Sequence, residues 1–437
     1  MPGTLLAIGW FALLLFAMRR VPFFRDAPGL PMRVIAGLFA AKVLAGTAVW
    51  AVYTYAYPDR ATADIFKYFD DSSVLHGALF TSPGDYLRML LGIGNDTPWF
   101  TDTYYSRMNH WVRRWDSGLH NDAHTMIRFN AALRLVSFGH YHVHTVFAAA
   151  VSLTGAVALY RALEPMVAHA RRGLAITVFL WPSALFWSSG VLKECLLMLG
   201  MGLLFLAAIG PWQRAFTLRR FVALALGAAL MLLVKAYVLL CLVPPLIAFA
   251  WCRHAPGRAA LKFLIVHAAF IGAALLIGPR VPQADALHAL TMKQSDFIGL
   301  TREVPTGSYI DLPVLEPTAW SFARHAPHAL ANAFLSPFAV LANGPLAWMG
   351  AAESFMLVAL LVLALWRRRA WKSMNVSAVL FALAFILLLS LLIGWTVPVV
   401  GALVRYRVPM LPFVGLLALL LVDPARLPSR IRQMIAP

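Results

Sequence analysis

Charged residues are scarce in this sequence, and acidic ones are the scarcest. Asp, Glu, Lys and Arg make up 13% of the 437 residues, whereas hydrophobic residues make up 61%. A soluble domain carries about a quarter charged residues, so this balance argues against one and predicts a polytopic membrane protein. The apolar runs are about twenty residues long and lack strict alternation, so we expect an all-α fold rather than a barrel.

Cysteine and the common catalytic signatures are also lacking. The three cysteines, Cys195, Cys241 and Cys252, lie in or at the ends of apolar runs, without a CxxC pair. This excludes a disulfide framework and a cysteine-based metal site. No P-loop, GxSxG, HExxH or dinucleotide fingerprint is present. The sequence therefore names no cofactor and no metal ligands, and a divalent metal bound by the acidic residues stays an open alternative.

The apolar runs predict about eleven membrane helices in one integral membrane domain, residues 1–437. Several runs are short for a perpendicular span, so we expect tilted or broken helices around Val234 to Pro245 and Trp181 to Gly190, with Lys235 and Pro244-Pro245 marking the first break. The predicted helices cover residues 1–18, 31–57, 141–162, 173–190, 193–210, 221–234, 236–251, 263–278, 346–366, 375–394 and 408–422.

The basic residues indicate how the helices are oriented. The net charge is +18, but the Lys and Arg residues lie in short segments between apolar runs, which is typical of the positive-inside rule and excludes a nucleic-acid partner. With the N-terminus outside, six inside segments hold 20 Lys or Arg and only three acids. We therefore expect a bacterial inner-membrane protein with a cytoplasmic C-terminus. The inside segments are 19–33, 161–172, 211–220, 253–262, 367–372 and the tail from 423.

Two large outside (periplasmic) segments result, residues 58–140 and about 279–345. The first contains aromatic amphipathic pieces such as DYLRMLLGIG, which we expect to lie on the membrane surface and roof a cavity. It also holds nine of the nineteen acids: Asp59, Asp64, Asp70, Asp71, Asp85, Asp96, Asp102, Asp116 and Asp122.

The stretch ADIFKYFDDSSVLHGAL, Ala63 to Leu79, carries the candidate catalytic residues. In a helix, Asp64, Tyr68 and Asp71 share one face at i, i+4 and i+7. A carboxylate at this place can act as a general base on an acceptor, with neighbouring Asp70 positioning it or holding a metal. The alternative is a solvated interfacial helix with an acidic first turn.

Two further motifs place charges at the ends of apolar helices. Lys193 and Glu194 begin a predicted helix, and Lys235 lies in the predicted break, where a phosphate or an acceptor can bind. Arg405 and Arg407 precede the last predicted helix on the outside, against the positive-inside trend, and two arginines can clamp a phosphate. The alternatives are snorkelling at the interface for the first pair and an interfacial anchor for the arginines.

These residues resemble the GT-C superfamily of integral-membrane glycosyltransferases, which use polyprenyl-phosphate-linked sugars. Asp64, Tyr68 and Asp71 match the spacing of the acidic motif in that family's first outside loop. WPSALFWSSGVLKE is similar to the segment between its fourth and fifth core helices, and RYRVPMLPF resembles the entry into its last helix. The adjacent Asp70 and Asp71 come later after the membrane exit than the family's usual acidic pair.

The resemblance implies an inverting glycosyltransferase that moves a sugar from a polyprenyl-phosphate carrier to a cell-envelope glycan or lipid acceptor. It implies Asp64 or Asp71 as the base, and Arg405 with Lys235 or Lys193 as the lipid-phosphate site. From the residues alone, a transporter or assembly protein for envelope polysaccharide or lipid, and an enzyme of the O-antigen polymerase or ligase type, remain alternatives.

Overall fold

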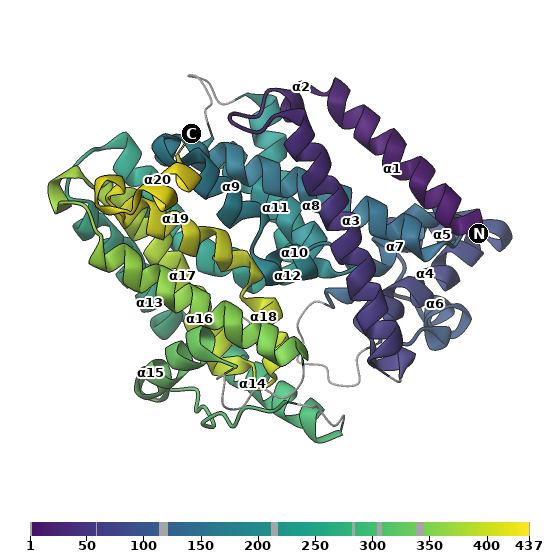
Figure 1. Cartoon of the computed structure of the whole chain (residues 1–437). Coiled ribbons are helices and arrows are strands. Elements are labelled where there is room, and N and C mark those ends of the chain that lie inside the picture. The colour runs from purple at the N-terminus through teal and green to yellow at the C-terminus, as the bar shows by residue number, and fades with distance from the viewer. Residues whose placement is uncertain are drawn as a thin grey trace. The chain divides into compact units, whose positions relative to one another are not determined.

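The regular structure of this chain is helical. The computed structural model in Figure 1 describes residues 2–57, 59–112, 121–210, 217–281, 285–303, 308–337 and 345–436. Within these ranges the strand-like pairings are two isolated bridges, Tyr309 with Val399 and Arg368 with Val422. The predicted all-α class is confirmed.

Within the described ranges, eight helical segments are long and apolar enough to cross a membrane, which supports a polytopic membrane protein, while the predicted count of eleven is not confirmed. The difference arises where the structure breaks or merges helices. The eight are Pro2–Arg20, Met32–Tyr55, Tyr141–Met166, Leu218–His254, Ala259–Ile277, Ala347–Trp366, Val376–Thr396 and Val400–Leu421.

The two predicted helices at 221–234 and 236–251 form one element, α12 (Leu218–His254), with a kink at Lys235. There the backbone turns extended, with φ −153° and ψ 73°, so the predicted break is confirmed at this residue. Pro244 and Pro245, also expected to mark the break, lie inside the helical stretch.

The predicted helix at 173–190 is instead two short helices, α9 (Arg171–Phe179) and α10 (Pro182–Trp187). Pro182 disfavours helical backbone at Trp181, which explains the interruption. Neither piece is long enough to span a bilayer, since a span needs about 20 residues. The interruption falls within the expected region, but the single membrane helix is a wrong prediction.

The last predicted helix, 408–422, begins too late. The candidate span runs from Val400 through α18 (Val400–Tyr406) and a 3₁₀ turn into α19 (Leu411–Leu421). Arg405 and Arg407 therefore lie within this apolar segment rather than ahead of it. Of the eight candidate spans this one is the most enclosed, with 94% of its apolar stretch buried.

Contacts divide the chain into two compact units, each described separately. Unit 1 comprises Met1–Ala162 and Leu185–Ala236. Its helices are α1 (Pro2–Arg20), α2 (Pro22–Arg25), α3 (Met32–Tyr55), α4 (Asp64–Thr81), α5 (Pro83–Leu91), α6 (Pro98–Thr103), α7 (Ala123–Ser137), α8 (Tyr141–Leu163), α11 (Lys193–Ile209) and the first part of α12.

At each end of unit 1, contacts join segments that the charge pattern assigns to the same side of the membrane. At one end, the Tyr160 hydroxyl donates to the Pro28 carbonyl at 2.7 Å, which joins the end of α8 to the α2–α3 connection. At the other end, the Trp10 indole N–H donates to the Val136 carbonyl at 3.2 Å, and Gly3 packs against His140. The first residues of α1 thus lie beside the start of α8.

Helices α8 and α11 approach each other without intervening side chains. Gly155 of α8 lies against the backbone of Met198, and Gly202 of α11 lies against the Gly155 carbonyl. Small residues allow helices within a membrane to pack this closely, with dispersion contacts between backbones as the gain. The contact fixes the position of α11 relative to α8, and with it the position of the first residues of α11, Lys193 and Glu194.

Unit 2 comprises Leu163–Ala184 and Tyr237–Pro437. The Asp423 N–H donates to the Arg367 carbonyl at 2.8 Å at one end, and the Gln294 amide donates to the Trp395 carbonyl at 2.8 Å at the other. Its further helices are α13 (Ala259–Ile277), α14 (Ala286–Glu303), α15 (Ala319–Leu335), α16 (Pro345–Trp366), α17 (Val376–Thr396), α18, α19 and α20 (Ser429–Ile435).

Candidate functional site

The predicted acidic helix exists as α4, and its aspartates have three different environments. Asp64 lies half-buried in the first turn, one turn before the buried Tyr68. Asp70 is exposed and accepts two hydrogen bonds from the Arg60 guanidinium, at 2.9 and 2.7 Å. Asp71 is buried. The three carboxylates therefore do not form one acidic cluster, although they lie within two turns.

Asp71 is held by the backbone. Its two carboxylate oxygens accept the N–H groups of Asn109 and His110, both at 2.8 Å. Burial raises the pKa of this carboxyl above its usual value, and the two N–H donors partly offset the rise. With each oxygen already used, Asp71 fits a positioning role for the 109–111 segment better than the role of a general base.

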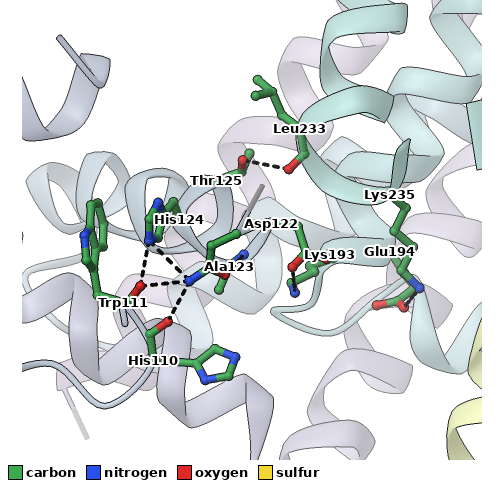
Figure 2. Close-up of polar contacts among 11 residues, drawn as sticks. His110, Trp111, Asp122, Ala123, His124, Thr125, Lys193, Glu194, Leu233 and Lys235 are labelled. Atoms are coloured by element: carbon green, nitrogen blue, oxygen red, sulfur yellow. Dashed lines mark hydrogen bonds and ion pairs between the residues drawn. The ribbon is translucent and has the colours of Figure 1, made fainter. Parts of the chain in front are cut away.

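Lys193, at the start of α11, pairs with a carboxylate that the sequence did not single out as a site residue. Its Nζ lies 2.8 Å from Asp122 Oδ1 and 5.3 Å from the centre of the Tyr68 ring. The Asp122 side chain is 28% exposed and that of Lys193 is 10% exposed. The pair joins the residue before α7 to the start of α11 (Figure 2). The Tyr68 ring adds a contact from α4.

Glu194 forms the second pair, with Lys235 at the kink of α12. The two side chains are 2.6 Å apart and almost fully enclosed, 0% and 3% exposed. Beside the kink, the Thr125 hydroxyl of α7 donates to the Leu233 carbonyl at 3.0 Å. We refer to Asp122, Lys193, Glu194 and Lys235 as the charged cluster, which grades from a partly accessible carboxylate to a buried ammonium (Figure 2).

Histidine and aromatic side chains border the charged cluster. The His110 ring lies 5.8 Å from the Tyr68 ring, centre to centre. His124 stacks on Trp111 with 3.9 Å between ring centres, and its Nε2 lies 2.8 Å from the Trp111 carbonyl oxygen. The Asn121 amide donates to the same carbonyl at 2.8 Å. These contacts join Trp111 to Asn121 and His124, the residues on either side of Asp122 and Ala123. Figure 2 shows Trp111 and His124 beside Asp122.

A buried lysine supports the cluster from the second candidate span. Lys42 of α3 donates to the hydroxyls of Ser152 and Ser188, both at 2.9 Å. One turn later, Gly46 lies against the Ser189 carbonyl. This face of α3 therefore holds the segment that directly precedes Lys193, a connection that no sequence pattern predicts.

The arginines of the RYR motif lie in unit 2. Arg407 is completely buried, and its Nη1 donates to the Ser354 hydroxyl at 2.8 Å and the Ala333 carbonyl at 3.3 Å. Arg405 is half-buried. An exposed pair of arginines that clamps a phosphate outside the membrane, as predicted, does not fit the burial of Arg407.

Sequence reasoning found Tyr68, Lys193, Glu194 and Lys235, which the structure places together, but missed Asp122, His110 and His124. Asp122 could have been found only as one of nine acids in the same segment. Asp116, another of those nine, lies outside the described residues. Within the described ranges, no group of three or more His, Cys, Asp or Glu side chains is arranged to hold a metal ion.

Comparisons with known proteins give no neighbour from which a role could be transferred. The chain matches no protein-family model, no curated protein and no solved structure.

Proposed function

We propose that this chain is a membrane glycosyltransferase that moves a sugar from a polyprenyl-phosphate carrier to an envelope glycan or lipid acceptor. The observation that carries the proposal is the charged cluster beside Tyr68, with ammonium and carboxylate groups adjacent and one end partly accessible. Such a transfer needs a group that takes the acceptor proton and a cation that stabilises the departing phosphate.

Asp122 and Asp64 are the two candidates for the base. Asp122 is partly exposed and lies 2.8 Å from Lys193, and Asp64 is half-buried one turn from Tyr68. Asp71 is less suited because both its oxygens accept backbone N–H groups. We therefore favour Asp64, at the start of α4, or Asp122, directly before α7, over Asp71 as the base.

The Asp122–Lys193 pair suggests how the donor prepares the site. The phosphate of the donor competes with Asp122 for the Lys193 ammonium, because both are anions. The released carboxylate then takes the proton as the acceptor hydroxyl oxygen bonds to the sugar's anomeric carbon. The bond from that carbon to the phosphate oxygen breaks, and the lipid phosphate leaves with the electron pair, held by Lys193. The buried Glu194–Lys235 pair keeps the start of α11 in place.

The proposal places the protein in a bacterial inner membrane, with the N-terminus and the charged cluster on the outer face and the C-terminus in the cytoplasm. Twenty Lys or Arg residues against three acids in the six inside segments support this orientation. Within each unit, contacts join segments assigned to the same side, for example Tyr160 with Pro28 and Asp423 with Arg367.

The test is mass spectrometry of envelope glycolipids and glycans in a deletion strain. The strain is complemented with wild type, Asp122→Asn, Asp64→Asn or Lys193→Met, and Asp70→Asn is the matched control because Asp70 is an exposed aspartate on the same segment. A fixed sugar-mass difference, restored by wild type and the control but lost in the Lys193 variant and at least one of the other two, supports the proposal. Full restoration by every variant at equal protein levels rejects it.

A transporter is the second candidate, favoured by the kink at Lys235. Discontinuous membrane helices with charged residues at the break are typical of transporter binding sites, and Lys42 adds a buried charge within a candidate span. If Glu194 and Lys235 variants abolish uptake that follows an ion gradient while glycan masses stay unchanged, transport is the better account. An O-antigen polymerase or ligase type enzyme would instead change glycan chain length.

A further inference from the structure

A separate groove lies on unit 1 beside the second half of α4. It encloses about 290 Å³ and is bordered by Ser73, Gly77 and Thr81 of α4 and by Tyr104 and Arg107, which follow α6. No residue of the charged cluster lines it. Nothing lies within 4 Å of the position that a side chain on Gly77 would occupy, so the floor of the groove is open there.

The groove offers one cation and several hydroxyls. Arg107 is exposed, and its guanidinium lies over the Tyr104 ring with 6.0 Å between its carbon and the ring centre. In the described part of the chain no carboxylate forms an ion pair with it. Arg107 Nη2 donates to the Thr103 carbonyl, and the Ser73 hydroxyl donates to the Asp70 carbonyl at 2.6 Å. An exposed guanidinium has further N–H donors, and beside hydroxyl groups it suits an anion with several acceptor oxygens, as a phosphate has.

The face of α4 next to the groove points toward a candidate membrane span. Phe66 and Phe69 pack on Tyr141, the first residue of α8, with ring centres 5.7 and 5.1 Å apart. Phe80 follows Phe69 by eleven residues, about three helical turns, so it shares this face. Unlike Phe66 and Phe69, which pack on Tyr141 of α8, Phe80 has a side chain that is 76% exposed. A ring in this position continues the apolar face of α4 into the membrane boundary.

An exposed aromatic side chain lies close to the groove, connected through Asp85 to Tyr104, which lines it. Trp99 of α6 is 61% exposed, and its indole N–H donates to Asp85 at 3.3 Å, the same carboxylate that accepts the Tyr104 hydroxyl at 3.1 Å. The ring is thus anchored by its polar edge while its apolar faces remain free. Tryptophan with one wet and one apolar side is typical of the zone between lipid headgroups and acyl chains.

We propose that this groove binds the phosphate headgroup of an anionic membrane lipid. Arg107 and the hydroxyls of Ser73 and Thr81 receive the phosphate, and Phe80 and Trp99 contact the first carbons of the acyl chains. The site is independent of the sugar-transfer proposal, since it shares no residue with the charged cluster. It fixes α4, and with it Tyr68 and Asp71, against the membrane.

The test measures lipid binding to the purified full-length protein. Native mass spectrometry from neutral detergent counts bound phosphatidylglycerol and phosphatidylcholine for wild type, Arg107→Gln, Phe80→Ser and the control Arg88→Gln. Arg88 is an exposed arginine of the same segment that does not line the groove. We expect wild type and the control to prefer phosphatidylglycerol, and Arg107→Gln to lose about fivefold in affinity for it, the share of one surface arginine.

Two outcomes would overturn the inference. If Arg107→Gln binds phosphatidylglycerol as well as Arg88→Gln does, the groove is not the headgroup site. If glycerol 3-phosphate, which has no acyl chain, displaces the lipid completely and Phe80→Ser has no effect, the groove binds a soluble anion and not a lipid. Circular dichroism of each variant checks that the helices remain intact.

Discussion

The charged cluster of unit 1 and two enclosed charges of unit 2, Glu353 and Arg407, are balanced in different ways. In the charged cluster each ammonium meets a carboxylate: Lys193 meets Asp122 and Lys235 meets Glu194. Glu353 and Arg407 are hydrogen-bonded by neutral groups. Arg407 donates to a hydroxyl and a carbonyl, and Glu353 accepts from the backbone N–H of Ser183 at 2.8 Å and from its hydroxyl at 2.6 Å.

We interpret the difference as one between charges proposed to react and charges that hold structure. Under the proposed function, the Asp122–Lys193 pair exchanges its carboxylate for the donor phosphate, and the Asp122 side chain is 28% exposed. Glu353 and Arg407 are enclosed, and their neutral partners connect α16 to the start of α10, to α15 and to the last candidate span. We therefore expect variants in unit 1 to change chemistry and variants in unit 2 to change packing.

The largest expected effect is on catalysis by Asp122. Asp122→Asn keeps the size of the side chain but removes a proposed base, and if Asp122 has that role we expect sugar transfer to fall by about 10²–10⁴. The free energy of unfolding should change by at most about 1 kcal/mol, since the Asp122–Lys193 ion pair is partly exposed. Transfer by membranes of matched protein content is the measurement. Wild-type transfer in Asp122→Asn, with loss in Asp64→Asn, would assign the base to α4.

Next in size is the enclosed pair of unit 1. Lys235→Met leaves the Glu194 carboxylate without its ammonium partner, and we expect a loss of about 3–5 kcal/mol in the free energy of unfolding. The double variant Lys235→Met with Glu194→Leu should recover much of that loss, because it removes both charges. Thermal unfolding in detergent measures both. Equal loss in the double variant would show that packing at the kink, not charge, is the cause.

A smaller effect is expected at Asp71. Asn in this place has one acceptor oxygen for two N–H donors, so Asp71→Asn should cost about 1–3 kcal/mol. It is therefore a poor test of catalysis on its own. Addition of a second lesion, Asn109→Pro, removes one of the two N–H donors and should lessen the further cost of Asp71→Asn if these bonds are its source.

The pKa of Asp71 adds a pH dependence of known sign. Because burial raises the folded-state pKa above the usual 3.8, the folded protein holds this proton more tightly than the unfolded chain does. The stability that the raised pKa of Asp71 contributes is complete below pH 3.8 and is lost as the pH rises through the folded-state pKa. The difference in unfolding temperature between wild type and Asp71→Asn should therefore shrink over that range. A difference that grows with pH would contradict the raised pKa.

At Arg407 we expect a loss of stability without a loss of transfer. Arg407→Met removes the donor to the buried Ser354 hydroxyl and Ala333 carbonyl, so we expect a cost of about 1–3 kcal/mol in the free energy of unfolding and unaltered transfer. The assay of transfer together with unfolding measures both. Loss of transfer with unchanged unfolding would remove the contrast between the units and restore the interpretation of Arg407 as a phosphate ligand.

The sequence predicted best where a rare residue interrupts an apolar run. Lys193, Glu194 and Lys235 are such residues, and the break at Lys235 was predicted because a charge inside a membrane helix needs a special environment. Asp122 gave no comparable signal because it lies in a polar segment among eight other acids. Only the fold, which places the start of α7 beside the start of α11, distinguishes it from them.

The arginines of the last span show the opposite failure. Two arginines before an apolar run predict a position outside the membrane, because sequence alone indicates no partner for a charge inside it. Helix α16 supplies Ser354 and helix α15 supplies the Ala333 carbonyl, so Arg407 can lie inside the apolar span. Such partners come from segments more than fifty residues away in the sequence, and local patterns carry no information about them.

The backbone contact between Gly155 and Gly202 has a consequence for genetic screens of this protein. Neither residue has a side chain that could bind a substrate, yet their contact sets the position of Lys193 and Glu194. A change as small as Gly202→Ala would push α11 away from α8, and a loss-of-function allele would then map to a residue with no chemistry of its own. Inherited defects in the site can thus arise far from every charged residue in it.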